Sequence, residues 1–283
     1  MRVQTSDHIS LWDASTAEDK FVSPLNGDLN CDVAIVGGGF TGLSTALHAA
    51  ERGIRCHVFE ANQIGFGGSG RNAGLVNAGM WLPPADVEQK LGKVRGGALV
   101  RSLGDAPEYV FSLIERFQIR CEVSRSGTIH AAHAPKGLDE LRRRADTWQK
   151  LGAPVELLSR EQATKLIGTD AFHGGLLDHR AGTINPMGYV RGLARAASAA
   201  GATISTGARI QKLDRQKSRW TLRTDQGVVT ADTVILATNA YTDTLWPRLE
   251  KTFVMIDYFQ IATKPLEERA MKILPGGQGL QGG

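Results

Sequence analysis

The stretch that decides the fold is VAIVGGGFTGLSTALHAAERGIRCHVFEA, residues 33–61. Its first apolar run, residues 33–36, predicts a buried parallel strand because it is short and does not alternate with polar residues. A helix over residues 43–52 follows, with its apolar side chains on one face, and Gly53 ends it. The run RCHVFE, residues 55–60, predicts a second strand. The stretch is therefore expected to form a strand–helix–strand unit.

The glycines after the first strand have separate expected tasks. Gly37 permits a tight turn, Gly39 lets the backbone approach a pyrophosphate, and Gly42 lets the helix pack against the strand. The N-terminus of the helix favours phosphate groups. At the end of the second strand, the Glu60 carboxylate can accept hydrogen bonds from both hydroxyls of a ribose. The sequence therefore predicts binding of an ADP moiety, and no arginine directly follows Glu60 to favour a 2′-phosphate.

The totals describe an ordinary globular protein. A chain of 283 residues with 42% hydrophobic and 22% charged residues is expected to form about two domains with a substantial core. The densest basic cluster, residues 142–144, lies among acidic residues. This favours the solvated face of a helix over a nucleic-acid-binding patch. The beginning of the sequence has no apolar signal core, and no apolar run is long enough for a membrane span. We therefore expect a cytoplasmic protein.

Cysteine and histidine positions argue against a metal site. The three cysteines, Cys31, Cys56 and Cys121, are an odd number without metal-like spacing, so we expect small core residues in a reducing compartment. Four histidines near expected strand edges also lack the spacing of metal ligands: His130, His133, His173 and His179. We predict no metal site and find no Ser–His–Asp or Cys–His set for nucleophilic catalysis.

Elements along the rest of the chain are expected as follows. Residues 1–27 form a polar leader that either packs on a domain or stays mobile. The glycine-rich segment 64–81 is a long loop, a type that is often functional. Helices are expected over 87–117, over 136–151, after Ser159, and over 185–201 with Asn185 as N-cap. Strands are expected at 121–123, 127–132, 202–206, 208–214, 219–224, 227–231 and 233–240. The last residues, 274–283, contain almost no core-forming side chains, so no strand is expected there and the chain looks truncated.

Two features favour FAD over NAD. After Glu60 the chain enters GFGGSGRNAG, residues 65–74, a small-residue loop suited to pass beneath an extended ligand. A nicotinamide enzyme usually continues with further strand–helix units at this point. The late run TVILATNAYT, residues 233–242, predicts a strand that can return to the first sheet. An NAD-dependent dehydrogenase is therefore the less favoured alternative.

These stretches, together with GTINPMGYVRGLARAA at residues 182–197, resemble the FAD-dependent amine and amino-acid oxidases of the D-amino-acid oxidase family. The likeness runs over residues 31–266 and is greatest to the branch that contains gamma-glutamylputrescine oxidase. It implies an α/β fold in which a Rossmann-like FAD-binding domain, residues 28–105 and 183–250, carries an inserted antiparallel-sheet substrate domain. That second domain would comprise residues 106–182 and 251–283 and would be incomplete.

The resemblance also implies roles for single residues. Gly37, Gly39, Gly42 and Glu60 would hold the ADP half of FAD, and residues 69–74 would follow the pyrophosphate, ribityl chain and flavin. The backbone of Ile210 would touch the adenine, and Ala237 and Thr238 would lie near the ADP ribose. The full set of implied cofactor-binding residues is Gly37, Gly38, Gly39, Thr41, Gly42, Glu60, Ser69, Gly70, Arg71, Asn72, Gly74, Ile210, Ala237 and Thr238.

Arg71 and Tyr258 are the candidate catalytic residues. Arg71 is either a fixed positive charge near the flavin or the partner of a surface acid. Tyr258 and Gln260 lie on a stretch that forms a strand lining the substrate cavity in the family, and alternation would put both on one face. Their alternative role is simple sheet packing.

The implied reaction is the oxidation of a small-molecule amine or amino acid. Hydride passes from the carbon that bears the nitrogen to flavin N5, the imine hydrolyses, and oxygen or another acceptor reoxidises the flavin. The protein would position the substrate and tune the cofactor. The alternative is a truncated, non-catalytic FAD- or ADP-binding remnant, because family members usually continue with further strands and a late glycine-rich turn. No oligomeric state is predicted.

Overall fold

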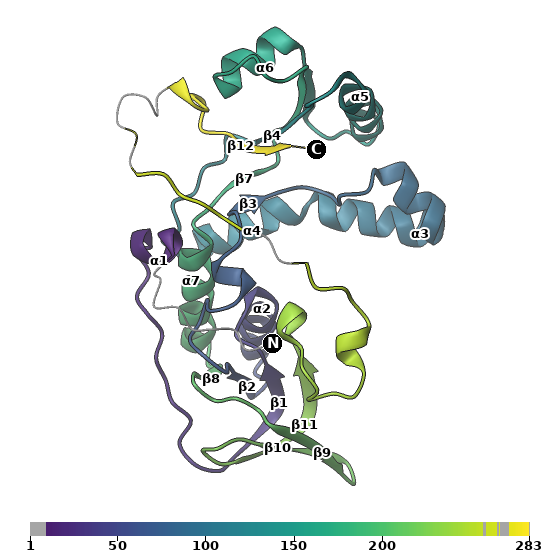
Figure 1. Cartoon of the computed structure of the whole chain (residues 1–283). Coiled ribbons are helices and arrows are strands. Elements are labelled where there is room, and N and C mark those ends of the chain that lie inside the picture. Colours follow the sequence, from purple (N-terminus) through teal and green to yellow (C-terminus); the bar gives the residue numbers. More distant parts are fainter. Residues whose placement is uncertain (1–9, 257–258, 265, 267–271, 283) are drawn as a thin grey trace. The chain divides into compact units, whose positions relative to one another are not determined.

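The computed structural model describes residues 10–256, 259–264, 266 and 272–282. These residues form two compact units, coloured along the sequence in Figure 1. The first unit contains residues 10–73, 117–121 and 185–260, apart from 257–258. The second contains residues 74–116 and 122–184 and the described residues from 261 onward. Each unit is considered by itself below.

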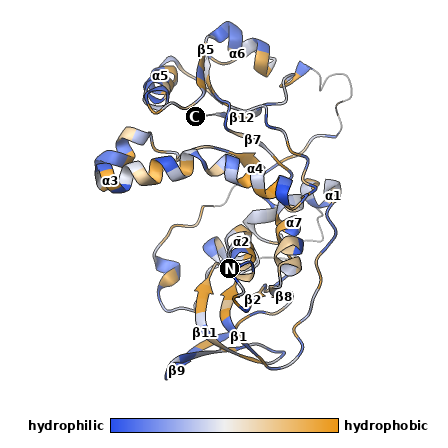
Figure 2. Ribbon diagram, turned by 180° about the vertical axis from the view of Figure 1, so that it is seen from behind, coloured by the Kyte–Doolittle hydropathy of each residue, from blue (hydrophilic) through white to orange (hydrophobic). Residues whose placement is uncertain are grey.

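The first unit is built on a six-stranded sheet of order β8-β2-β1-β11-β10-β9. Its first four strands are parallel neighbours, and β10 and β9 continue the sheet in antiparallel pairs. The central strand β1 is fully buried at Ala34 and Ile35. The apolar character of β1 and β11 is plain in Figure 2. The strands are β1 (Leu29–Val36), β2 (Cys56–Phe59), β8 (Thr203–Ser205), β9 (Lys212–Gln216), β10 (Arg219–Arg223) and β11 (Val228–Leu236).

Helices α2 (Phe40–Ala50) and α7 (Pro186–Ala199) pack on each other in this unit. The rings of Phe40 and Tyr189 meet between them, with centroids 5.2 Å apart. The side chain of Asn185 accepts a hydrogen bond from the N–H of Gly188 at 3.0 Å, which confirms the predicted N-cap. The remaining helices of the unit are short: α1 (Leu11–Ser15), η1 (Gly68–Gly70), η2 (Asn239–Tyr241) and η3 (Leu249–Lys251).

The second unit holds a four-stranded sheet of order β12-β4-β6-β5 and a two-stranded pair β3-β7. Helix α5 packs on one face of the larger sheet through Trp148, and α6 packs on the other face through Ile167. Strands β4, β6 and β5 are antiparallel, whereas β12 is parallel to β4, so the sheet is mixed. The elements are β3 (Leu75–Val76), α3 (Pro84–Gly104), α4 (Ala106–Arg116), β4 (Thr128–Ala131), α5 (Pro135–Lys150), β5 (Val155–Leu158), α6 (Arg160–Ile167), β6 (Gly175–Asp178), β7 (Gly182–Thr183) and β12 (Gly279–Gly282).

Several local predictions are wrong for identifiable reasons. The helix expected over 87–117 is two helices separated at Asp105, and Gly92 inside α3 is not helical. No strand forms at 121–123, because Glu122 has a left-handed φ of 50° that a strand does not allow. The strands expected at 227–231 and 233–240 are the single strand β11. The charge at Asp232 does not interrupt β11, because this residue is exposed and its carboxylate accepts a hydrogen bond from Arg219 at 2.7 Å. The strand expected at 208–214 begins only at Lys212.

Two further expectations, both about the late part of the chain, are wrong. Residues 274–283 were expected to form no strand, yet β12 pairs with β4, since a ladder uses backbone groups that glycine also has. Around residues 256–263, where a strand was expected, the described residues form none. Val254 and Phe259 there are 86% and 95% exposed. Tyr258 lies outside the described residues.

The compact units differ from the predicted domain limits in several places. Residues 117–121 and the described part of 251–260 lie in the first unit, although the predicted substrate domain included them. Helix α3 belongs to the second unit, although the predicted FAD-binding domain included residues up to 105. Residues 10–27 pack on the first unit, with Leu25 buried in the core of the six-stranded sheet, which is the first of the two alternatives predicted for this leader. The predicted domains are functional divisions and stay a prediction.

All three cysteines are buried and free, as predicted. Burial raises the pKa of the Cys31 thiol to about 11, with a smaller contribution from the neighbouring Asp32 carboxylate. At neutral pH this thiol is therefore protonated, and its environment is that of a core residue.

Candidate functional site

The turn after β1 is closed around Gly37. Its N–H donates to the carbonyl of Phe59 at the end of β2, at 2.9 Å, and its φ is +111°. A Cβ atom on Gly37 would lie 2.6 Å from the carbonyl oxygen of Ala237, which follows β11. The N–H of Ala237 in turn donates to Val36 at 2.8 Å. The ends of three strands therefore meet at a position that only glycine can occupy, as the predicted tight turn requires.

The next glycines allow the helix and the following loop to approach the turn. A methyl group on Gly42 would overlap the carbonyl oxygen of Gly37. A methyl group on buried Gly38 would lie 2.8 Å from the side chain of Ile64 and 3.0 Å from Cβ of Glu60. The predicted close packing of the helix on the turn at Gly42 is therefore confirmed.

The N-terminus of α2 is completed by a residue from the glycine-rich loop. Gly39 is the N-cap and offers no side chain, so the hydroxyl oxygen of Ser69 accepts the N–H of Phe40 at 3.1 Å. The hydroxyl of Ser69 keeps its own hydrogen for another acceptor. Thr41 in the first turn is exposed. A helix N-terminus with free donors and an adjacent hydroxyl is a favourable place for an anion.

Glu60 is fixed at the end of β2 on both sides. Its N–H donates to the carbonyl of Ser205, and its carbonyl accepts from Ala208. Its carboxylate accepts the N–H of Gly38 at 2.8 Å through Oε2 and that of Asn62 at 2.9 Å through Oε1. Because a carboxylate has about four acceptor positions, each oxygen can still accept a hydroxyl.

The loop of residues 65–74 is held against α7. A methyl group on Gly65 or Gly70 would overlap the side chain of Met187, in the first turn of α7. The side-chain amide of Asn72 donates to the carbonyls of Gly68 and Ser69, at 3.1 Å each. The loop is therefore shaped by its own hydrogen bonds and by the helix behind it.

Arg71 presents an exposed guanidinium on this loop. Its Cζ lies 4.7 Å from the ring centroid of Phe66, a cation–π arrangement. Among the described residues no carboxylate forms a salt bridge with it, so the surface-acid alternative has no partner there. Its role near a flavin stays a prediction.

The strand-end residues of the predicted set lie in the same unit. Ile210 is buried with Val36 and Phe59, so only its backbone can face a ligand. Thr238 shares a hydrogen bond of 2.6 Å with the hydroxyl of Thr242. These residues and the turn at Gly37 are all parts of the first unit.

Tyr241 and His57 are two residues that sequence reasoning missed. The ring of Tyr241 covers Gly67, where a Cβ atom would lie 2.9 Å from the ring. An aromatic residue directly after the small residues ATNA was the available signal. His57 on β2 has Nε2 2.8 Å from Oγ of Ser205 and stacks on Phe59 with centroids 4.3 Å apart. Burial lowers the pKa of His57 to about 4, so the ring is neutral at pH 7.

Two predicted residues are not brought to this cluster. Gly74 belongs to the second unit, where its carbonyl accepts the N–H of Ile184 at 2.9 Å. Tyr258 is outside the described residues.

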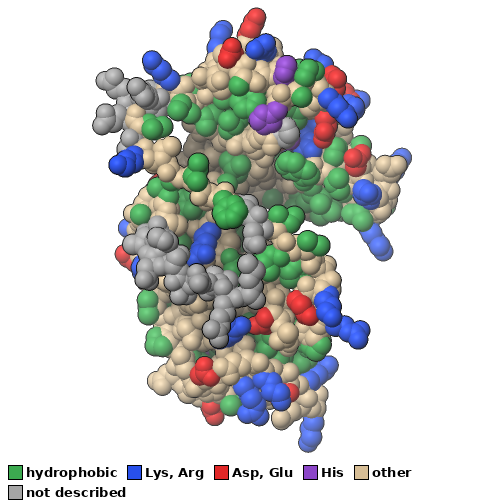
Figure 3. All heavy atoms as spheres, viewed as in Figure 1, with side chains coloured by type: hydrophobic (Ala, Val, Ile, Leu, Met, Phe, Trp, Pro, Cys, Tyr) green, Lys and Arg blue, Asp and Glu red, His purple; other side chains and the backbone are tan. Residues whose placement is uncertain are grey.

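The described residues offer neither a metal centre nor a membrane-spanning helix. In the part of the chain that the structure describes, no group of His, Cys, Asp and Glu side chains could hold a metal. No described helix is both long enough and apolar enough to cross a membrane. Arg142 and Arg144 on α5 pair with Asp139 and Glu140, at 2.6 and 4.0 Å. Basic and acidic side chains lie side by side over the upper part of the face in Figure 3. Arg142 is 56% exposed, as expected for a solvated face, whereas the Arg144 side chain is only 11% exposed and donates to the carbonyl of Trp81.

A family model described as FAD dependent oxidoreductase (DAO) matches residues 32–280. The chain belongs to this family. The predicted family resemblance and the α/β, Rossmann-like fold class are thereby confirmed, and FAD is the cofactor of the family.

Individual relatives agree with this assignment. The chain is 35% identical over 277 residues to gamma-glutamylputrescine oxidoreductase of Escherichia coli, covering 95% of this chain and 64% of that protein. It is 31% identical to a probable oxidoreductase, OrdL, of Rhizobium meliloti, covering 94% of this chain and 63% of that one. The crystal structure of glycine oxidase from Geobacillus kaustophilus superposes with a TM-score of 0.64 at 27% identity, covering 75% and 56% of the two chains. This member of the family thus spans somewhat less than two thirds of the curated relatives.

The residues of the first unit fit the family's cofactor. Residues 37–39, directly before α2, carry no side chains, the Ser69 hydroxyl lies beside them, and Glu60 retains acceptor capacity. These are the groups that a pyrophosphate and a ribose diol require.

Proposed function

We propose that the first unit binds FAD and that the protein oxidises the CH–NH bond of a small amine or amino acid. The observation that carries the proposal is the meeting of the glycine turn, the N-terminus of α2 and the Glu60 carboxylate within one unit. Membership of the FAD-dependent oxidoreductase family supports the redox class. The names of two relatives, gamma-glutamylputrescine oxidoreductase and glycine oxidase, support the substrate class.

In this proposal each part of the cluster has a binding task. Glu60 accepts hydrogen bonds from the ribose hydroxyls, while the bare backbone around Gly39 and the hydroxyl of Ser69 receive the pyrophosphate. The backbone of Ile210 lines the adenine, and the segment at Ala237 and Thr238 borders the ribose.

The loop of residues 69–74 would follow the cofactor toward its reactive end. There the exposed Arg71 guanidinium contributes a fixed positive charge. When bound, FAD supplies the two-electron oxidation by accepting hydride from the carbon that bears the nitrogen. Oxygen or another acceptor takes the electrons afterwards, and the imine product hydrolyses in water.

Cofactor binding is tested by titrating the purified chain with FAD and with ADP in a calorimeter. Glu60→Gln keeps the shape of the side chain but removes its charge. Hydrogen bonds to a charged group contribute about 1.5–3 kcal/mol, so we expect affinity for both ligands to fall about tenfold to a hundredfold. Glu161→Gln, at an exposed position in the first turn of α6, is the matched control and leaves both affinities unchanged. A wild-type chain that binds neither ligand would refute the proposal.

The redox step is tested on FAD-loaded protein under anaerobic conditions. Amines, sarcosine, glycine and other amino acids are added one at a time, and bleaching of the visible flavin absorbance reports reduction. Reduction by at least one of these compounds supports the proposed activity. An FAD-loaded protein that none of them reduces would leave cofactor binding intact and would count against oxidation of the CH–NH bond.

A further inference from the structure

Residues 10–25 form an extended segment, here called the strap, along the first unit. Near its end, Ser23 exchanges two hydrogen bonds with Thr206, at 2.7 and 3.0 Å, and Leu25 is buried in the core of the sheet. Near its beginning lies the short helix α1. Between these ends the strap runs along α7 (Figure 1). It therefore connects the C-terminal end of β8 with the N-terminal part of α7.

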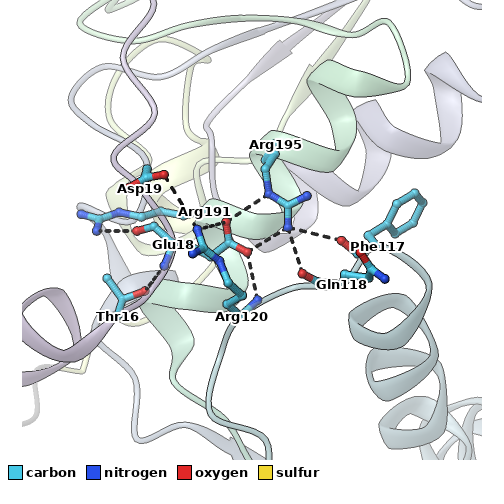
Figure 4. A network of polar contacts seen from close by, with 8 residues as sticks. All are labelled: Thr16, Glu18, Asp19, Phe117, Gln118, Arg120, Arg191 and Arg195. Carbon is cyan, nitrogen blue, oxygen red and sulfur yellow. Dashed lines mark hydrogen bonds and ion pairs between the residues drawn. The ribbon is translucent and has the colours of Figure 1, made fainter.

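The strap is fixed on α7 by buried charges (Figure 4). The Glu18 side chain is only 2% exposed and accepts two hydrogen bonds from Arg195, at 2.8 and 3.1 Å, and one from the N–H of Arg120, at 2.9 Å. Burial alone would raise the pKa of Glu18, but these donors and the two arginine charges hold it below its ordinary value. Glu18 is buried while Arg195 is 47% exposed, and leaving a buried carboxylate without its donors is costly, so the strap has a firm attachment.

A second attachment lies closer to the N-terminus of α7. Asp13 forms an ion pair with Arg191, whose side chain is 5% exposed. The side-chain amide of Asn185, the N-cap of α7, donates to the hydroxyl of Ser15 at 3.0 Å. Together these contacts fix the position of α1, and with it the direction of the neighbouring Trp12 side chain.

The side chain of Trp12, on α1, contacts the glycine-rich loop that begins at Gly65, here called the cofactor loop. Its indole Nε1–H donates to the carbonyl of Asn72 at 2.9 Å. The side chain of Asn72 then holds the carbonyl of Ser69 at 3.1 Å, and the hydroxyl of Ser69 accepts the N–H of Phe40 at the start of α2. A continuous series of hydrogen bonds thus leads from the strap to the N-terminus of α2.

We propose that Trp12 is a positioning residue for the cofactor loop: held by the strap, it keeps residues 67–72 in the conformation that receives the flavin side of FAD. The proposal rests on the proposed function, because it assumes that FAD is the ligand of this loop. A protein whose binding-competent conformation is only partly populated binds its ligand more weakly in proportion. Loss of the Trp12 hydrogen bond therefore lowers affinity for FAD without removing any group that touches it.

The test compares Trp12→Phe with Trp246→Phe. The first variant keeps a ring and removes the donor, whereas Trp246 packs on Trp220, with centroids 5.9 Å apart, and serves as the control. We expect Trp12→Phe to weaken FAD binding about fivefold, the effect of one net hydrogen bond of about 1 kcal/mol. Affinity for AMP, which carries the ribose held by Glu60 but lacks the second phosphate beside Ser69, stays unchanged. Hydrogen exchange of residues 67–73 in the ligand-free protein becomes faster in Trp12→Phe only.

The outcomes separate a positioning role from a general structural one. Equal weakening of FAD and AMP binding would assign Trp12 a role in stability alone. Unchanged FAD affinity, or unchanged exchange of the loop, would overturn the proposal. If the wild-type chain binds no FAD, the proposed function fails and the positioning of FAD fails with it. The exchange measurement then shows separately whether Trp12 fixes the loop.

Glu18→Gln provides a second, independent variant. It weakens the attachment of the strap while leaving the Trp12 side chain in place. We expect faster exchange over residues 16–25 and over the loop, and an FAD affinity that is reduced, but at most as much as in Trp12→Phe. Faster exchange of the strap with an unchanged loop and unchanged FAD affinity would contradict the proposed link between them.

Discussion

Two glycine-rich stretches of this chain, GGGFTG at residues 37–42 and GGQGLQGG at residues 276–283, look alike in composition but fold for different reasons. In the first, methyl groups on Gly37 and Gly42 would meet backbone atoms that cannot move aside. In the second, a methyl group on Gly279 would meet the ends of the side chains of Leu75, Thr183 and Thr128. At the turn, glycine is therefore required because the backbone leaves no room for a side chain. In β12, glycine only avoids contacts with side chains that can move.

We expect Gly42→Ala to have the largest effect on the free energy of unfolding. A small effect would contradict this comparison. Alanine is the better helix former by about 1 kcal/mol, so propensity alone predicts stabilisation of α2. The overlap with the carbonyl of Gly37 predicts the opposite, a loss of about 3 kcal/mol in the free energy of unfolding. Urea denaturation followed by circular dichroism measures the difference.

Gly68→Ala is the matched control for this substitution. Gly68 lies in η1 without a left-handed φ, and no heavy atom lies within 4 Å of the place that a methyl group would occupy. The free energy of unfolding of this variant should stay within about 0.5 kcal/mol of the parent. A Gly42→Ala protein as stable as Gly68→Ala would show that the turn can open at little cost.

His57 adds a second property of the first unit to this comparison, because its pKa makes the stability of the sheet depend on pH. Its folded pKa of about 4 lies below the unfolded value of about 6.5. The unfolded state therefore binds more protons below pH 6.5, and stability falls as the pH decreases from 6.5 toward 4. We expect a contribution of about 2 kcal/mol lost between pH 7.5 and pH 5.

The measurement compares the parent with His57→Gln, which retains a partner for the Ser205 hydroxyl. Other groups titrate in both proteins, so the difference between their pH profiles isolates His57. The variant should lose less stability than the parent over this range. Parallel profiles would mean that His57 is not held neutral in the folded state.

Among the substitutions that are expected to lower stability, Gly279→Ala should have the smallest effect. The side-chain ends that it meets can rotate away, so we expect a loss of about 1 kcal/mol in the free energy of unfolding. The same urea titration measures it. A loss as large as that of Gly42→Ala would show that β12 is packed as rigidly as the turn.

The first unit's strand–helix–strand core was predictable because local and long-range signals agree there. The apolar run of β1, the glycines at fixed spacing and the acid at the end of β2 all favour one structure. The parallel pairing of β1 with β11 was foreseen only as a late strand that returns to the first sheet. Its register, Leu29 opposite Val229, depends on contacts between distant residues.

The sequence was least informative where backbone groups alone decide the structure. Nothing in GGQGLQGG shows that its N–H and C=O groups pair with β4. The capping of α2 by Ser69 and the hydrogen bond from Trp12 to Asn72 likewise join segments that are far apart in the chain. Such contacts leave no periodic pattern in the sequence. The sequence could therefore predict a functional glycine-rich loop, but not the hydrogen bonds that fix its conformation.

The place of β1 between β2 and β11 has a consequence for synthesis. A ribosome completes β1, α2 and β2 early, but β11 follows the end of β1 by about 200 residues. At about 5–20 residues per second, one edge of the central strand β1 waits roughly 10–40 s for its partner. During that interval the nascent chain exposes an unpaired hydrophobic edge, the kind of surface that recruits other chains. Yield of soluble protein should therefore depend on translation speed and on chaperones that cover this edge until β11 emerges.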